Sequence, residues 1–265
     1  MIGRRNPWSL RTATLLVFLA AAAMIFSGTT RAADAPKKKV PAVDKTMILV
    51  HGLWQDGKDL QKLSNLLGNN GFKVLRFEYA SNEVMVEDAS AELARFVRKH
   101  APTTEVHFVG FSLGNLVIRQ CLGRIQKLKP RPKVGRIVMI APPNHGARTA
   151  TKYNKKRIGR LIGGPVIRQL GPEFNKLQPT LDTPRDFGII AGGKGDNIGY
   201  SKKDLPGDDD DWLTVETTRL SGAADFRLVK ARHAKLDDDS RVHKLALEFL
   251  ENGYFESAQT RQRIP

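Results

Sequence analysis

The chain has 265 residues, a formal net charge of +16 and a single cysteine, Cys121. One thiol excludes an internal disulfide framework. The length suits one domain with a substantial hydrophobic core, and Cys121 lies on the apolar side of a predicted helix, where we expect a small core residue. The basic clusters at 119–136 and 152–160 lack the interleaved aromatic residues of a nucleic-acid-binding surface, so we expect no nucleic-acid partner.

The first 33 residues have the layout of a secretory signal peptide. Three arginines precede an apolar stretch at 15–26, and small residues follow around 30–33. The apolar stretch is shorter than the roughly 20 residues of a membrane-spanning helix, which makes an uncleaved N-terminal anchor the alternative. We therefore expect residues 1–33 to be removed and the protein to be exported, to the periplasm or outside the cell.

Residues 34–45 contain Pro36, three consecutive lysines and Pro41, and they are predicted to be a flexible charged linker. Without residues 1–33 the chain keeps 39 basic and 27 acidic side chains, a net charge of about +12. For an exported protein of this charge, an anionic membrane or envelope surface is the expected macromolecular partner.

From residue 46 onward, strands alternate with helices. The predicted strands are 46–50, 73–77, 105–109, 135–140, 187–191 and 225–229, and the clearest predicted helices are 60–67, 83–100, one that follows residue 112, and 240–252. Alternation of this kind predicts a mostly parallel sheet of about six strands covered on both faces. Reactive side chains in such sheets gather beyond the carboxyl ends of the strands.

Gly110-Phe111-Ser112-Leu113-Gly114 joins the third strand to the helix that follows it. A serine in this position lies in a tight turn, and the flanking glycines avoid a clash between the strand and the helix. The pattern favours a nucleophile elbow with Ser112 as the nucleophile. A plain strand-to-helix turn is the alternative reading.

A serine nucleophile needs a histidine as general base, and the chain offers six. His233 follows the last strand and precedes the last helix, which places it where a loop can bring an imidazole to the serine. His243 lies opposite an apolar helical stripe and is expected to be a surface residue. His107 lies inside a strand and His100 ends a helix, so both are expected to be structural, and His145 lies in a Pro/Gly turn and is a weak candidate.

The residues alone do not single out the acid of a triad. Asp208, Asp209, Asp210 and Asp211 are consecutive, and Asp196 lies closer to its strand. Such a run is also compatible with a solvated loop or with a Ca²⁺ site. The core-like residues 212–215 follow at once, which indicates that the end of the run is held against the fold.

A tetrahedral intermediate needs two N–H donors. Leu113, directly after the serine, supplies one at a helix N-terminus, and Leu53 in His51-Gly52-Leu53 supplies the second. His51 itself is expected to hold this loop by packing or hydrogen bonding.

The order of these parts resembles the α/β-hydrolase superfamily, in particular its small lipase and esterase branch, over about residues 45–255. Ala141-Pro142-Pro143-Asn144-His145-Gly146 is similar to the family's Pro-x-x-Gly turn. The resemblance implies an α/β-hydrolase fold and the chain order nucleophile, acid, histidine, matched by Ser112, Asp210 and His233. Lipase-like relatives carry an Asp-Gly-x-Val element before Val-x-x-Thr-x-Leu. Aligning residues 215–220 with the second element places Asp210 at the position of the acid.

The chain departs from that pattern at two positions. Asp211 stands where the glycine is expected, which keeps Asp211 as an alternative acid, and Asp196 is a weaker alternative that matches a Gly-x-x-Asp placement after the strand. Asn115 stands where many relatives repeat glycine, a change that we expect to matter little.

These observations predict an exported serine hydrolase that cleaves carboxylic esters through an acyl-enzyme, with a small-molecule or lipid ester as substrate and no cofactor or metal. The alternatives are an acyltransferase or amidase with the same triad, and a non-catalytic binding protein of the same fold. The predicted hydrolase domain is 46–255, with a tail at 256–265. Within the domain, 147–182 is a possible cap whose apolar residues face the acyl group and whose basic residues face an anionic interface; a charged surface excursion is the alternative.

Overall fold

The computed structural model describes residues 45–201 and 204–265. The predicted signal peptide at 1–33, and the predicted linker at 34–45 except for its last residue, therefore lie outside the described residues. Within the described ranges, none of the helices has the length and apolarity needed to cross a membrane.

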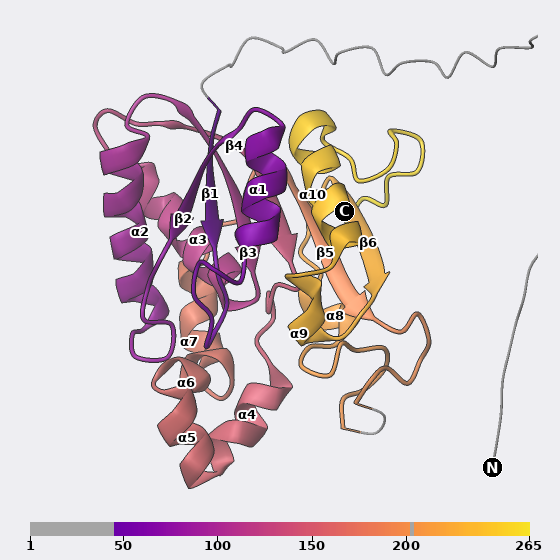
Figure 1. Cartoon of the computed structure of the whole chain (residues 1–265). Helices are drawn as coiled ribbons and strands as arrows, with labels where there is room; N and C mark the ends of the chain where they lie inside the picture. Colours follow the sequence, from indigo (N-terminus) through magenta and orange to yellow (C-terminus); the bar gives the residue numbers. More distant parts are fainter. Residues whose placement is uncertain (1–44, 202–203) are drawn as a thin grey trace, which may run out of the picture. The chain divides into compact units, whose positions relative to one another are not determined.

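Six strands form one parallel sheet in the order β2-β1-β3-β4-β5-β6 (Figure 1). The strands are β1 Lys45–Val50, β2 Lys73–Phe77, β3 Glu105–Phe111, β4 Lys133–Ile140, β5 Phe187–Gly193 and β6 Asp225–Lys230. β5 is buried along its whole length and β1 from its second residue onward, as expected for continuous apolar strands with both faces covered. The predicted six-strand parallel sheet and the α/β-hydrolase fold are confirmed.

Helices cover both faces of the sheet. α1 (Gln61–Asn69) and α10 (Ser240–Asn252) lie in front of it in Figure 1, while α2 (Val86–His100) and α3 (Leu113–Ile125) pack together on the other face. The buried residues of α2 recur every three or four positions, so its apolar stripe faces the sheet. Cys121 lies fully buried in α3, where burial raises the pKa of its thiol and favours the uncharged form.

The possible cap region between β4 and β5 consists mainly of short helices. It contains α4 (Arg148–Lys155), α5 (Arg157–Gly163), α6 (Val166–Leu170), α7 (Phe174–Leu177) and the 3-10 turn η1 (Gln178–Thr180). These helices lie beyond the carboxyl ends of the central strands (Figure 1). Two further short helices, α8 (Val215–Thr218) and α9 (His233–Leu236), flank β6.

The C-terminal residues 256–265 are tied to the loop before β6. The Gly222 N–H donates to the Ile264 carbonyl at 2.8 Å, and the Ile264 N–H donates to the Ala223 carbonyl at 3.1 Å. Arg227, buried in β6, donates to the Thr260 carbonyl at 2.6 Å. The tail therefore packs on the same edge of the sheet as β6, away from the carboxyl ends of the central strands.

Candidate active site

Ser112 lies in a strained turn between β3 and α3. Its φ is +49°, in the region that side-chain-bearing residues rarely adopt, and its N–H donates to the Ile140 carbonyl at 2.9 Å. The flanking glycines are required by space, because a Cβ on Gly114 would collide with the backbone oxygen of Val50, and one on Gly110 with the Asn115 side chain. The turn therefore presents the serine side chain beyond the end of β3.

Asn115 stabilises this turn, contrary to the expectation that its replacement of glycine matters little. Its side chain is fully buried, and its Nδ2 donates to the carbonyl oxygens of Ser112 and Ile140, both at 3.0 Å. Both carbonyls lie next to the elbow, so Asn115 ties the first turn of α3 to the end of β4. A side chain at this position thus restrains the backbone of the serine.

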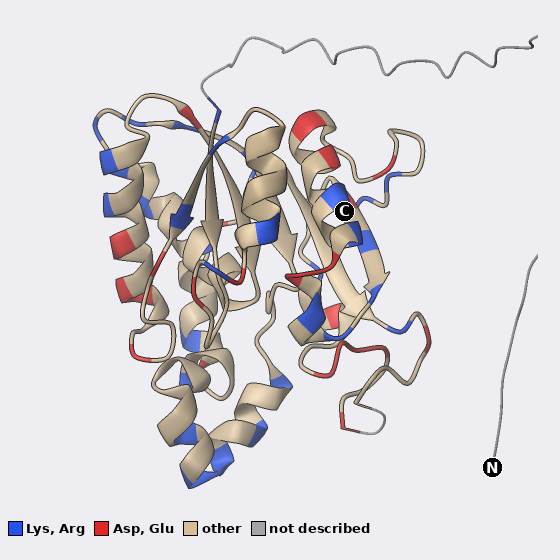
Figure 2. Ribbon diagram, in the orientation of Figure 1, with Lys and Arg blue, Asp and Glu red and all other residues tan. Residues whose placement is uncertain are grey.

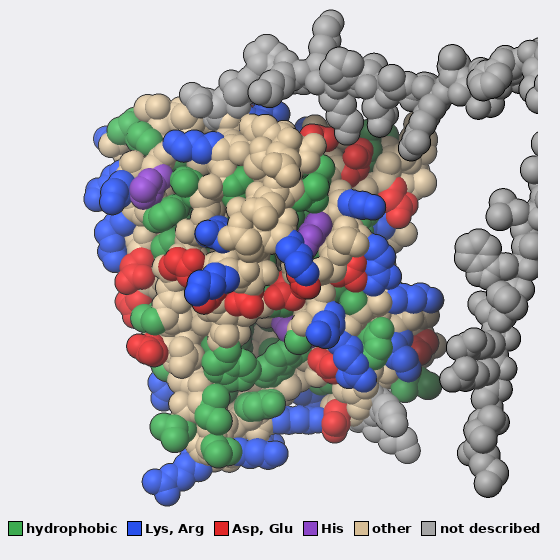
Figure 3. Space-filling model, viewed as in Figure 1, with side chains coloured by type: hydrophobic (Ala, Val, Ile, Leu, Met, Phe, Trp, Pro, Cys, Tyr) green, Lys and Arg blue, Asp and Glu red, His purple; other side chains and the backbone are tan. Residues whose placement is uncertain are grey.

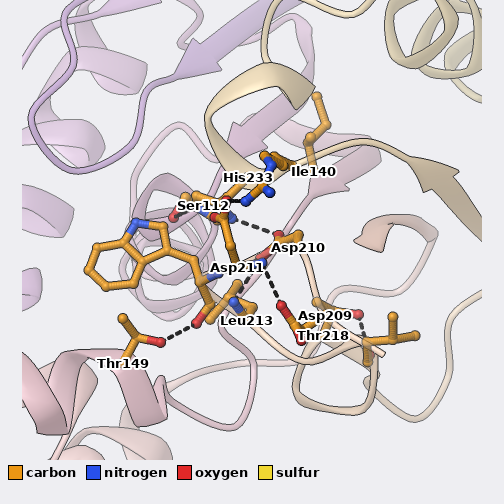
Figure 4. A network of polar contacts seen from close by, with 12 residues as sticks. Ser112, Ile140, Thr149, Asp209, Asp210, Asp211, Leu213, Thr218 and His233 are labelled. Atoms are coloured by element: carbon orange, nitrogen blue, oxygen red, sulfur yellow. Dashed lines mark hydrogen bonds and ion pairs between the residues drawn. The ribbon is translucent and has the colours of Figure 1, made fainter. Parts of the chain in front are cut away.

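Ser112, His233 and Asp210 form one continuous chain of hydrogen bonds (Figure 4). The Nε2 atom of His233 lies 2.9 Å from the Ser112 Oγ, and its Nδ1 atom lies 2.7 Å from the Asp210 Oδ2. The backbone N–H of His233 also donates to the Asp210 carbonyl at 2.7 Å. His233 begins α9 and is buried, so its ring is held between the elbow and the acidic loop.

The Asp210 carboxylate is completely buried and fully partnered. One oxygen faces His233, and the other accepts the backbone N–H groups of Trp212 at 3.0 Å and Leu213 at 2.7 Å. The Asp210 N–H donates in turn to the Leu213 carbonyl at 3.0 Å. A tight turn over 210–213 therefore satisfies the charge that burial would otherwise penalise.

The two alternative acids point elsewhere. The Asp211 carboxylate lies 2.7 Å from the guanidinium of Arg232, and Asp196 accepts the N–H groups of Ile198 and Gly199 in an exposed turn. Asp211 has a φ of +80°, the left-handed conformation for which glycine is best suited and which aspartate tolerates. The backbone at Asp211 therefore has a conformation that glycine would adopt easily. This explains how the chain accommodates an aspartate where the resemblance implies a glycine.

The other two members of the acidic run hold the loop together. Asp208 accepts the N–H groups of Lys194 and Gly195, both at 2.8 Å, and Asp209 accepts those of Ser201 at 2.9 Å and Asp211 at 2.7 Å. Among residues 45–201 and 204–265, no group of three or more His, Cys, Asp or Glu side chains is arranged to hold a metal ion. Of the four consecutive aspartates, Asp210 thus faces His233 and Asp211 faces Arg232, while Asp208 and Asp209 both hold the loop.

The loop after β1 lies directly against the elbow. A Cβ on Gly52 would come within 3.2 Å of the Ser112 Cβ. Leu53 follows Gly52, and Leu113 is the first residue of α3, so both predicted N–H donors lie on backbone next to the serine. The helix N-terminus adds a partial positive charge on the Leu113 side. This pair of segments is suited to stabilising a negatively charged oxygen.

His51 holds the loop, as expected from its sequence position. Its ring stacks on Tyr79 with 4.5 Å between centroids, and its Nδ1 donates to the Gly52 carbonyl at 2.9 Å. Burial lowers the pKa of His51 below its usual value, an effect that outweighs its hydrogen bond to Gly52 and the nearby carboxylates. A neutral imidazole with its proton on Nδ1 therefore fixes the backbone that precedes Leu53.

A link that the sequence did not reveal joins this loop to the segment that carries His233. Gln55 accepts the Gly52 N–H at 2.9 Å, and its Nε2 donates to the Asp237 Oδ2 at 2.5 Å. Asp237 directly follows α9 and is buried, and burial raises the pKa of its carboxyl group. We refer to Gln55 and Asp237 as the Gln55–Asp237 clamp.

The prediction that His243 is a surface residue was wrong. It is only 5% exposed, and its Nε2 lies 2.6 Å from the Asp237 carbonyl oxygen. The α9–α10 connection covers the side of α10 that the apolar stripe leaves free, and this is why the histidine is buried. Of the other histidines, His107 is buried in β3 and accepts the Arg136 N–H at 2.9 Å, while His145 is exposed.

A small cavity of about 170 Å³ opens beside Ser112 and His233. Its walls are mainly apolar, and the side chains that line it include Leu53, Trp54, Phe111, Pro143, Ala147, Ala150, Leu170, Trp212 and Leu213. Three aromatic rings gather at one side: Trp54 and Trp212 stack with 6.0 Å between centroids, and Tyr153 contacts both. The space next to the nucleophile thus suits an apolar group.

Comparison with known proteins supports the same class of site. Residues 42–145 match the family model described as "Putative serine esterase (DUF676)". The match covers less than half of the chain, includes the loop after β1 and the elbow, and ends before Asp210 and His233. No curated protein matches the sequence significantly.

Solved structures share the fold at low sequence identity. A lipase from Bacillus licheniformis aligns over 83% of this chain and 96% of its own, with a TM-score of 0.57 and 17% identity. A Listeria innocua protein aligns over 84% of this chain and 99% of its own, with a TM-score of 0.53 and 17% identity. A metagenomic carboxyl esterase aligns over 74% of this chain and 67% of its own, with a TM-score of 0.55 and 13% identity.

The six-strand parallel sheet, the strained Ser112 and the esterase family match agree with one another. The hydrogen-bonded Ser112, His233 and Asp210 also lie in the chain order of an α/β-hydrolase. The chain therefore has an α/β-hydrolase fold with the arrangement of a serine hydrolase site, and the part that carries the elbow is similar to a family of serine esterases.

Proposed function

We propose that the protein is an exported esterase that cleaves carboxylic esters through a covalent acyl-enzyme, with Ser112 as nucleophile, His233 as general base and Asp210 as the acid that orients it. One observation carries the proposal: the unbroken path from the Ser112 Oγ through both nitrogens of His233 to a buried, fully partnered carboxylate. A binding protein would not require all three groups in this arrangement.

In the first half-reaction the Ser112 Oγ attacks the ester carbonyl carbon and its proton passes to the His233 Nε2. The carbonyl oxygen becomes negatively charged and accepts hydrogen bonds from the N–H groups of Leu53 and Leu113. The C–O bond of the ester then breaks, and His233 donates its proton to the departing alcohol. Water, deprotonated by His233, attacks the acyl-enzyme in the second half-reaction and releases the carboxylic acid and free Ser112.

The substrate that this cavity favours is an ester with an apolar acyl group. Its walls are mainly apolar, and its volume of about 170 Å³ accommodates a short chain inside, with any longer chain passing alongside the stacked Trp54 and Trp212 rings. The lipase and carboxyl esterase folds that resemble this chain are consistent with such substrates.

Export is supported by the arginine-led apolar stretch at 15–26 and the small residues before 34. The strongly basic composition supports work at an anionic envelope surface. Cell fractionation with mass measurement of the mature N-terminus tests the location. Recovery of the unprocessed chain from the cytoplasm would contradict export.

Activity is tested with a chain-length series of chromogenic esters and the wild-type protein beside the Ser112→Ala variant. We expect turnover by wild type, covalent labelling of Ser112 by a fluorophosphonate, and loss of both in the variant. Label attached to another residue, or equal turnover by both proteins, would refute the assignment. Addition of an acceptor alcohol or amine separates hydrolysis from acyl transfer by the product formed.

A further inference from the structure

α5 has the reverse of the usual distribution of apolar residues. Its large aliphatic side chains point outward: Ile158, Leu161 and Ile162, at i, i+3 and i+4, are 65%, 82% and 54% exposed. Its inner face carries glycine, and a Cβ on Gly159 or Gly163 would collide with Tyr153 or Ile167. The outer apolar face of α5 therefore contributes nothing to the core of the described domain.

Cations surround this face and no acid lies close to it in the sequence. Residues 148–172 hold seven Lys and Arg and no Asp or Glu. Lys155, Lys156, Arg157 and Arg160 are all exposed, whereas Lys152 pairs with Asp204 at 3.1 Å. Figure 2 shows the blue residues gathered at the lower end of α4 and α5, and Figure 3 shows hydrophobic side chains over the same end of the view.

The same helix is joined to the mouth of the cavity. The Trp54 Nε1 donates to the Ile162 carbonyl at 3.0 Å, and Trp54 lines the cavity together with Ser112. The turn after α5 is also fixed, because Gly164 has a φ of +64° and lies so close to the Asn82 backbone that no Cβ would fit. A surface that engaged the outer face of α5 would thus lie next to the entrance of the active site.

We propose that α5 docks the protein onto an anionic lipid surface, with Ile158, Leu161 and Ile162 entering the boundary between headgroups and acyl chains. Lys155, Lys156 and Arg157 then lie at headgroup level, where each is attracted to anionic lipid. This partner fits better than a protein because lysine is depleted from the centres of protein interfaces, whereas aliphatic residues beside Lys and Arg are typical of helices that lie in a membrane surface. The docking proposal rests on the proposed function in one respect: docking would bring the active site close to its ester substrate.

Binding is measured by co-sedimentation with vesicles, using the full-length chain with Ser112→Ala so that no lipid is consumed. Vesicles of equal parts phosphatidylglycerol and phosphatidylcholine are compared with phosphatidylcholine alone. Each cation near an anionic surface strengthens binding by about fivefold, so Lys155→Gln/Lys156→Gln/Arg157→Gln is expected to weaken it by roughly a hundredfold. Raising the salt from about 0.1 M to about 1 M shortens the screening length from about 10 Å to about 3 Å and should give a similar loss.

The apolar contribution is tested separately. Leu161→Ser is expected to weaken binding by roughly tenfold at either salt concentration, because the transfer of its aliphatic side chain is not screened. The matched control, Arg98→Gln/Lys99→Gln/Lys127→Gln, removes the same charge from exposed positions at the C-terminal ends of α2 and α3, near the amino ends of the strands and thus opposite to α5, and it should bind like the parent chain.

Equal binding of the α5 variants and the control, or equal binding to anionic and neutral vesicles, would overturn the proposal. The same α5 substitutions are also made in the chain that keeps Ser112, and hydrolysis of a short soluble ester by these variants is measured. This measurement separates a failure of the docking proposal from a failure of the proposed function. Vesicle binding without ester hydrolysis by the wild-type protein would refute the esterase and leave docking, and the reverse would refute docking alone.

Discussion

The acidic loop runs into one wall of the cavity at Trp212 and Leu213, whereas α5 lies outside the cavity and contacts its wall through Trp54, and the two regions are built in opposite ways. In the loop, charged side chains are buried and their oxygens are matched by backbone N–H groups, as for Asp209 and Asp210. In α5, aliphatic side chains are exposed and the interior contacts are made by glycines. Buried charge and exposed apolar surface are both costly for folding, so each marks a place where the chain departs from the arrangement that stability alone favours.

The difference suggests a division of roles. The acidic loop positions reacting groups to within hydrogen-bond distance and tolerates little change, because an unpaired buried carboxylate or amide costs several kcal/mol. The outer face of α5 touches no reacting group and should tolerate change when the substrate is dissolved. Substitutions in the acidic loop should therefore lower ester hydrolysis, whereas substitutions on the outer face of α5 should lower only attachment to a surface.

The largest effect is expected for Ser112→Ala, which removes the proposed nucleophile. We expect kcat/KM for a soluble ester to fall by roughly 10⁴-fold or more. The melting temperature should not fall, because the hydroxyl makes a single hydrogen bond to His233 and alanine fits the same turn. Steady-state kinetics and calorimetry on the same preparation check both statements, and a large fall in melting temperature would show that the loss reflects misfolding.

Asp210→Asn is expected to lower kcat by roughly 10³- to 10⁴-fold, since an amide no longer holds His233 in the tautomer that accepts the serine proton. Asp211→Asn and Asp196→Asn change neighbouring carboxylates that face Arg232 and an exposed turn, and they should remain within a few-fold of wild type. The acid assignment moves to Asp211 or Asp196 if one of those variants loses more activity than Asp210→Asn.

The Gln55–Asp237 clamp should have an intermediate effect. Gln55→Ala leaves the Gly52 N–H without its acceptor and frees the loop that carries the Leu53 N–H, so we expect kcat to fall by about 10- to 100-fold with little change in KM, less than the loss of a whole oxyanion donor. Gln55→Glu brings two carboxylates together and should behave similarly. Leu161→Ala, on α5, is the control and should leave soluble-ester kinetics unchanged.

A double substitution tests whether the clamp acts by position. Gln55→Glu/Asp237→Asn reverses the donor and acceptor across the 2.5 Å contact while keeping an oxygen for the Gly52 N–H. We expect it to recover most of the activity that Gln55→Glu loses, which gives a positive coupling in the double-mutant cycle. Additive losses would show that the two residues do not act through each other.

Most of the fold was predictable because it depends on local pattern. Continuous apolar runs such as 46–50 and 187–191 became central strands, and Ser112 and His233 were recognisable because each follows a strand. The acid could not be identified from local pattern, because the four consecutive aspartates have identical side chains. Only the three-dimensional course of the loop directs one of them toward His233. Asn115 and Gln55 were missed because their partners, Ile140 and Asp237, are 25 and 182 residues away in the chain.

The smallest expected effect is that of Asp211→Gly, which restores the residue found in relatives. Asp211 has a φ of +80°, and glycine adopts this conformation without the steric cost of a side chain, commonly about 1 kcal/mol. The substitution also removes the exposed ion pair with Arg232, which contributes at most about 1 kcal/mol. We therefore expect a change in unfolding free energy of no more than about 1 kcal/mol by denaturant titration, in either direction, with kcat retained because the 210–213 turn keeps its backbone geometry. A large loss of activity would instead mean that the Asp211 carboxylate takes part in the chemistry, and it would remove the distinction between the one aspartate that faces His233 and its neighbours that only shape the loop.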